Sequence, residues 1–168
     1  QNINLNQNDF IFLKNAFGIL KQDTTLQVQI ATFLLAFSYL FSLPFIILDA
    51  QSKIDLGGVQ IGILITVQMV GSMLSNILWG RLSSQGKNKL IVHIVLFTFI
   101  ACIILAFFAN SLIAYSVIFF FIGTALDGNR LASSNLILII APEDKRPIYN
   151  ALQSNITFIG IFFSIFGG

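Results

Sequence analysis

Five long apolar stretches divide this sequence, and each is long enough to cross a lipid bilayer as a helix. They cover residues 26–48, 59–79, 90–109, 112–140 and 148–168. About 20 apolar residues in an α-helix span the roughly 30 Å of hydrocarbon in a bilayer. Only the fourth stretch contains charged residues, Asp127 and Arg130. The sequence therefore predicts an all-α fold, a polytopic bundle of about five transmembrane helices over residues 25–168.

The composition excludes most soluble classes of protein. Charged residues make up 10% of the chain and hydrophobic residues 56%, whereas a soluble domain carries about 25% charge. A soluble enzyme, a disulfide-rich secreted domain and a disordered tail are therefore excluded. The net charge of +2 gives no reason to expect a nucleic-acid partner. With one cysteine, Cys102, and one histidine, His93, we expect no metal site, no cofactor and no enzymatic activity.

The basic residues between the stretches predict the orientation of the chain in the membrane. Seven of them fall in the connections on one side and only Lys53 in those on the other. The seven are Lys14, Lys21, Arg81, Lys87, Lys89, Lys145 and Arg146. Because cytoplasmic loops are enriched in Lys and Arg, the sequence predicts an integral membrane protein with a cytoplasmic N-terminus.

Residues 1–24 precede the first stretch and are more polar. Phe10, Leu13, Phe17 and Leu20 recur at helical spacing, which predicts a cytoplasmic linker with an amphipathic helix in the membrane interface. A polar linker with a few buried phenylalanines fits the same pattern equally well. The chain begins with Gln1 and stops at the end of an apolar run, so we interpret it as a piece of a longer protein.

Polar residues recur at helical spacing on four of the five stretches, and the third has no such stripe. The clearest members are Gln68, Ser72, Ser75 and Asn76 on the second; Gly123, Asp127, Arg130 and Ser134 on the fourth; Asn150, Gln153 and Thr157 on the fifth; and Gln29, Thr32, Ala36 and Tyr39 on the first. Polar side chains in hydrocarbon need polar partners, so these stripes are expected to face inward. They indicate either a polar passage bordered by four helices or closely packed helix seams.

The charged pair in the fourth stretch is the strongest candidate site. Asp127 and Arg130 are three residues apart, so they share a helix face and can pair. Arg130 could anchor a carboxylate or phosphate, and Asp127 could bind a cation or carry a proton. The alternative is a silent ion pair that joins two helices. The candidate pathway residues are Asp127, Arg130, Gln68, Ser72, Asn76, Gln153, Thr157 and Tyr39.

Two segments resemble the major facilitator superfamily of transporters. Residues 79–89, WGRLSSQGKNK, are similar to the signature loop of that family, roughly G-x-L-a-D-r-x-G-r-r/k, with Ser84 and Gln85 in place of the acid and the following base. Residues 141–152, APEDKRPIYNAL, are similar to the loop between the tenth and eleventh helices of bacterial members.

The resemblance implies half of a major-facilitator-type transporter, helices seven to eleven, with helices one to five as the second placement. It also implies alternating access, in which this half rocks against the missing other half of the polypeptide around a small-molecule site. The loop would gate the passage through Gly80, Arg81, Gly86, Lys87 and Lys89. A bacterial inner membrane is the expected location. The alternative function is a non-transporting membrane scaffold or a degenerate transporter half.

Overall fold

The computed structural model describes residues 39–141 without interruption, and residues 24, 27, 28, 31, 143 and 146 singly. The continuous part forms four helices, α3 (Tyr39–Lys53), α4 (Gly58–Ser84), α5 (Asn88–Phe108) and α6 (Leu112–Ile140). Over these described residues the chain contains no strand, which confirms the all-α class. The expected amphipathic helix at 10–20 and the expected fifth span lie outside the described residues.

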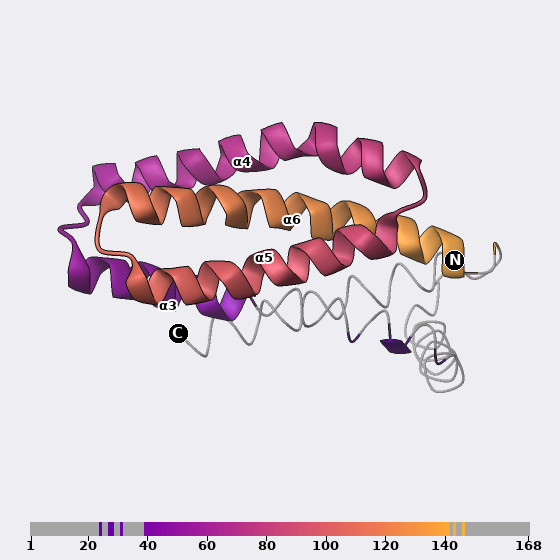
Figure 1. Ribbon diagram of the computed structural model, residues 1–168, viewed down its shortest axis with the longest axis horizontal. Coiled ribbons are helices and arrows are strands. Elements are labelled where there is room, and N and C mark those ends of the chain that lie inside the picture. The colour runs from indigo at the N-terminus through magenta and orange to yellow at the C-terminus, as the bar shows by residue number, and fades with distance from the viewer. Residues whose placement is uncertain are drawn as a thin grey trace, which may run out of the picture.

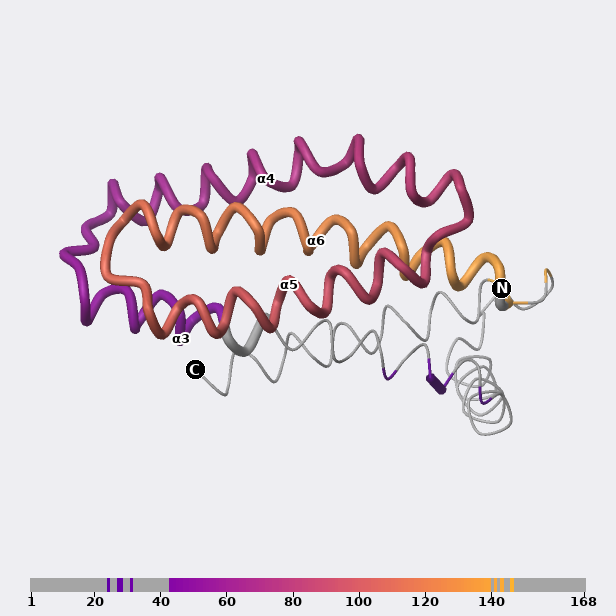
Figure 2. Tube along the Cα trace, in the orientation of Figure 1, coloured from indigo at the N-terminus to yellow at the C-terminus, as the bar shows by residue number. Residues whose placement is uncertain are grey.

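Short connections force the three long helices to run alternately up and down. Residues 85–87 join α4 to α5, and Gly86 there has φ +73°, in the left-handed region that favours glycine. Residues 109–111 join α5 to α6, and Ser111 caps α6 by accepting a hydrogen bond from the backbone N–H of Ala114 at 3.2 Å. Figure 2 shows the chain reversing at each of these two points.

Helix α6 lies between α4 and α5 (Figure 1). In the apolar 18-residue stretch of α6, 44% of the residues are buried, compared with 33% in the corresponding stretch of α5 and 17% in that of α4. On α5 the buried residues, which include Val95, Phe99 and Cys102, recur every three to four positions and form one stripe. The opposite side of α5 exposes large apolar side chains such as Phe97 and Ile104. These exposed apolar surfaces fit a lipid environment, and α4, α5 and α6 are each long and apolar enough to cross a membrane.

Two glycines bring α4 and α6 into backbone contact. A Cβ atom on Gly123 of α6 would collide with the backbone carbonyl oxygen of Gln68. In the reverse direction, a Cβ atom on Gly71 of α4 would collide with the carbonyl oxygen of Phe120. Thr124 Oγ1 adds a hydrogen bond to the carbonyl oxygen of Gly71 at 3.3 Å. Small residues thus set the distance between these helices, as is typical of helix packing in membranes.

A polar cluster joins α3, α5 and α6 at the end of the bundle opposite the 85–87 loop. Lys53 Nζ donates to Asp49 Oδ2 at 3.0 Å and to the carbonyl oxygens of Ala106 and Phe107 at 3.2 and 3.1 Å. Tyr115 Oη donates to the same Asp49 oxygen at 2.7 Å. Since Lys53 binds the last carbonyls of α5, it places a positive charge where the helix dipole is negative.

This cluster predicts acid sensitivity. Asp49 lies just beyond the expected first span, and the hydrogen bond from Tyr115, followed by that from Lys53, lowers its pKa below the ordinary value of 3.8. Because the pKa of Asp49 is lower in the folded protein than in the unfolded protein, its ionised carboxylate stabilises the fold. This contribution is fully present above the pKa of the unfolded protein and is lost as the pH falls through the pKa of the folded protein. We therefore expect the melting temperature of the complete protein in detergent to decrease when the pH is lowered below about 4.

The comparison that checks this expectation uses two matched variants. Asp49→Asn removes the titrating group, so its melting temperature should fall less between pH 6 and pH 3 than that of the unchanged protein. Asp55→Asn, which removes an exposed carboxylate with no hydrogen bond in the described structure, should keep the full drop. Equal drops in the unchanged protein and in Asp49→Asn would contradict the role of the cluster.

Candidate functional site

The carboxylate of Asp127 projects from the middle of α6 toward α4. Its Oδ2 atom accepts hydrogen bonds from Ser72 Oγ and from Asn76 Nδ2, the latter at 3.3 Å. Both donors belong to α4, where they lie one turn apart. The second carboxylate oxygen, Oδ1, has no hydrogen-bond partner among the described residues. Asp127 is half-buried, so this oxygen is placed to receive a further ligand.

The polar stripe predicted on α4 divides into two parts. Gly71 and Ser75 are buried on the side that packs against α6, so they belong to a helix seam. Ser72 and Asn76 lie beside that seam and supply the donors for Asp127. Gln68 is half-buried, and its backbone rather than its side chain makes the close approach to Gly123. The helix-seam interpretation therefore holds for Gly71 and Ser75, and the polar passage stays a prediction for Gln68, Ser72 and Asn76.

The ion pair between Asp127 and Arg130 that their spacing allows is not formed. Asp127 instead takes its hydrogen bonds from α4, and Arg130 is exposed with no ion-pair partner among the described residues. The neighbouring Ser134, one turn further along α6, is exposed as well. A silent bridge joining two helices is thus not what this geometry provides. Asp127 and Arg130 instead lie about one turn apart on α6, and among the described residues the guanidinium of Arg130 has no ion-pair partner.

This arrangement can bind groups of either charge. A guanidinium presents several N–H donors in a fixed plane and recognises carboxylate or phosphate through paired hydrogen bonds. A carboxylate with one free oxygen accepts from a cation or takes up a proton. In a membrane interior both charges are costly unless they contact polar groups or water. Over the described residues, no group of three or more His, Cys, Asp or Glu side chains is close enough to hold a metal ion.

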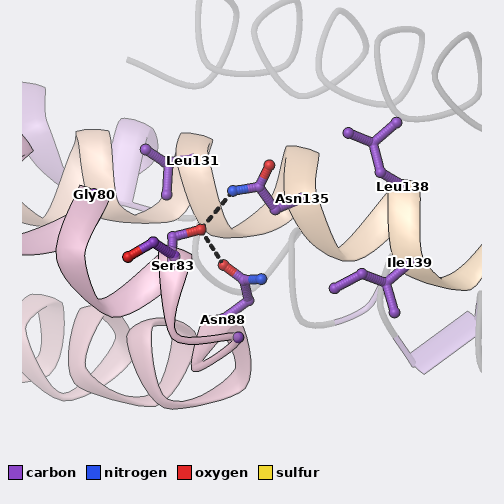
Figure 3. Close-up of a pocket in the computed structure, with 9 residues that line it drawn as sticks. Gly80, Ser83, Asn88, Leu131, Asn135, Leu138 and Ile139 are labelled. Atoms are coloured by element: carbon purple, nitrogen blue, oxygen red, sulfur yellow. Dashed lines mark hydrogen bonds between the residues drawn. The ribbon is translucent and has the colours of Figure 1, made fainter.

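A second polar group joins α4, α5 and α6 at the 85–87 loop (Figure 3). Ser83 Oγ donates to Asn88 Oδ1 at 2.7 Å and accepts from Asn135 Nδ2 at 2.6 Å. Of the loop residues predicted to gate a passage, Gly80 and Gly86 line the adjacent pocket, and Lys87 occupies the position before α5 without a capping hydrogen bond from its side chain. The side chains of Arg81, Lys87 and Lys89 are all exposed.

Sequence reasoning missed the two asparagines of this group. Asn135 is 52 residues from Ser83 in the chain, and nothing in the loop itself points to it. The one available signal is an amide within the apolar run 112–140. Of the remaining predicted pathway residues, Tyr39 begins α3 but its side chain is not described. Gln153 and Thr157 lie outside the described residues.

Comparison with protein-family models decides the family. The model of the Major Facilitator Superfamily matches residues 28–168, which is most of the chain. The chain belongs to the major facilitator superfamily. Members of this superfamily are membrane transport proteins, so the chain is an integral membrane protein from a family of transporters rather than of enzymes. The match includes all of α3 to α6 and both segments that resemble the family in sequence. No curated protein and no solved structure matches the chain.

Proposed function

We propose that this chain is part of a secondary active transporter that moves a small solute across a membrane by alternating access. In this proposal α3 to α6 are helices seven to ten of a twelve-helix protein, and the other half of the polypeptide completes the passage. Major-facilitator transporters bind their substrates between two halves near the middle of the membrane. The end of the bundle that carries Arg81, Lys87 and Lys89 faces the cytoplasm, as the distribution of basic residues favours.

The observation that carries the proposal is the environment of Asp127. Its carboxylate lies halfway along a helix that is long enough to span the bilayer. In the described structure, however, one carboxylate oxygen and the guanidinium of Arg130 have no hydrogen-bond or ion-pair partner. A purely structural pair would satisfy both charges internally, because isolated charges are costly in hydrocarbon. Partnerless charges on one side of α6 fit a surface that meets water and substrate.

The loop after α4 would gate this passage through neutral contacts. Ser83, Asn88 and Asn135 bind one another without a charged member, next to Ser84 and Gln85, the positions at which the family signature has an acid and a base. Neutral hydrogen bonds contribute only about 1 kcal/mol each, so the contact can break and re-form as the two halves rock. The weakness of these hydrogen bonds supports a reversible contact rather than a permanent one.

Uptake by cells that produce the complete protein tests the proposed function. The probes are a panel of radiolabelled sugars, amino acids, organic acids and organic cations. We expect saturable uptake of at least one probe that exceeds uptake by cells without the protein. A chain that reaches the membrane in normal amount but transports no member of the panel would favour the scaffold alternative.

A further inference from the structure

A pocket of about 570 Å³ opens beside the 85–87 loop, between the ends of α4 and α6 and the start of α5. One wall is polar and includes Ser83, Asn88 and Asn135, and the other is apolar and consists of Leu131, Leu138 and Ile139. Figure 3 shows the labelled residues facing this space from all three helices. A site with one polar and one apolar wall suits an amphiphile. We call it the loop pocket.

The polar wall of the loop pocket offers hydrogen-bond donors that the described residues do not use. Asn88 is 3% exposed, and among the described residues its side chain bonds only through Oδ1, which leaves Nδ2 without a partner there. Figure 3 places that nitrogen on the side away from Ser83. No side chain of the described residues caps the start of α5, so its first amides are unused by this part of the chain as well. The last carbonyls of α4 are already occupied, since Ser83 and Leu82 accept from the amides of Gly86 and Lys87.

The charge around the loop pocket is positive. Arg81, Lys87 and Lys89 alternate with the lining residues along the chain, and all three are exposed without an ion-pair partner in the described structure. Glu143, a described acid that follows the end of α6, pairs with Arg146 at 3.6 Å. Unused N–H donors, a helix N-terminus and three unpaired cations together favour an anion with several acceptor oxygens.

We propose that the loop pocket binds the phosphate headgroup of an anionic phospholipid. The phosphate oxygens accept from Asn88 Nδ2 and the first amides of α5, and the acyl chains run along the apolar wall. Clusters of Lys and Arg next to a transmembrane helix attract anionic lipids. The proposal concerns binding alone and does not depend on the transport function.

Native mass spectrometry of the complete protein in detergent measures this binding, with phosphatidylglycerol and phosphatidylcholine as probes. Phosphatidylglycerol should bind more tightly, because phosphatidylcholine has a headgroup with no net charge. Removing two charges with Lys87→Gln and Lys89→Gln should weaken phosphatidylglycerol binding about 25-fold, at about fivefold per basic residue. Phosphatidylcholine binding should stay unchanged, which controls for correct folding. Equal affinity for the two lipids in the unchanged protein would overturn the proposal.

A matched pair of variants tests the role of the asparagine. Asn88→Asp replaces the free donor by a carboxylate oxygen and should weaken phosphatidylglycerol binding at least tenfold. Asn110→Asp makes the same change at the opposite end of α5 and should have no effect. An equal effect of both variants, or of neither, would contradict a phosphate at Asn88. Competition by inorganic phosphate as strong as that by the lipid would show a site for soluble phosphate and would refute the lipid assignment.

Discussion

Replacing Asp127 by Asn is expected to reduce solute uptake by about 10-fold to 100-fold without reducing the amount of protein in the membrane. Asparagine has nearly the same shape, and its Oδ1 atom still accepts hydrogen bonds from Ser72 and Asn76, so the contact between α4 and α6 survives. What disappears is the negative charge and one acceptor oxygen. A hydrogen bond to a charged group contributes about 1.5–3 kcal/mol, which corresponds to the stated loss in rate.

The controls for Asp127→Asn come from the same chain. Asp55→Asn removes an exposed acid from the connection between α3 and α4 and should leave uptake unchanged. Arg130→Ala should lower uptake at least as much as Asp127→Asn, again with normal abundance, because Arg130 is exposed and makes no hydrogen bond or ion pair in the described structure. If Arg130→Ala instead lowers abundance and leaves uptake per molecule unchanged, its role is structural and the proposed site is wrong.

Adding side chains at the two close-approach glycines is expected to disrupt the bundle itself. Gly123→Val places carbon atoms where the backbone carbonyl oxygen of Gln68 lies, and a backbone atom cannot move aside as a side chain can. Overpacking of this kind costs about 1–3 kcal/mol or more. We expect Gly123→Val to lower the melting temperature in detergent and the yield of monodisperse protein, with Gly71→Val acting in the same direction.

A third glycine provides the matched control for this experiment. A Cβ atom on Gly62, also within α4, would meet nothing within 4 Å. Gly62→Val therefore keeps its melting temperature close to that of the unchanged protein, since the added side chain has open space. Equal destabilisation by Gly62→Val and Gly123→Val would show that helix propensity, and not the contact between α4 and α6, determines the result.

Local properties of the chain were sufficient to predict the helices. Apolar runs of about 20 residues must be helical in a bilayer, so the ranges 59–79, 90–109 and 112–140 fall within or close to α4, α5 and α6. The family signature also identified the 79–89 loop from the sequence alone, because the residues of this loop are adjacent in the chain.

The partners of the site residues could not be predicted in this way. Spacing alone paired Asp127 with Arg130, since both lie on one helix. The observed partners, Ser72 and Asn76, are more than 50 residues away and reach Asp127 only because Gly71 and Gly123 let two helices touch. Asn135 was missed for the same reason. Contacts between helices depend on their rotation and separation, and a hydropathy pattern on a single helix contains neither quantity.

Chemical labelling distinguishes a water-filled passage from a surface covered by lipid. With the buried Cys102 replaced by Ala, single cysteines are placed at Ser134, on the side of α6 that carries Arg130, and at Ile104, on the outer side of α5. Both positions are exposed, Ile104 by 52%, so exposure alone cannot explain a difference between them. A membrane-impermeant, charged thiol reagent reacts only where water reaches the thiol.

The decisive measurement is the rate at which this reagent modifies each cysteine in the complete protein within intact membranes. If Asp127 and Arg130 border a passage for solutes, Ser134→Cys reacts rapidly and Ile104→Cys does not react. If Ser134→Cys is as inert as Ile104→Cys, the charged side of α6 is dry and the transport site proposed for it does not exist.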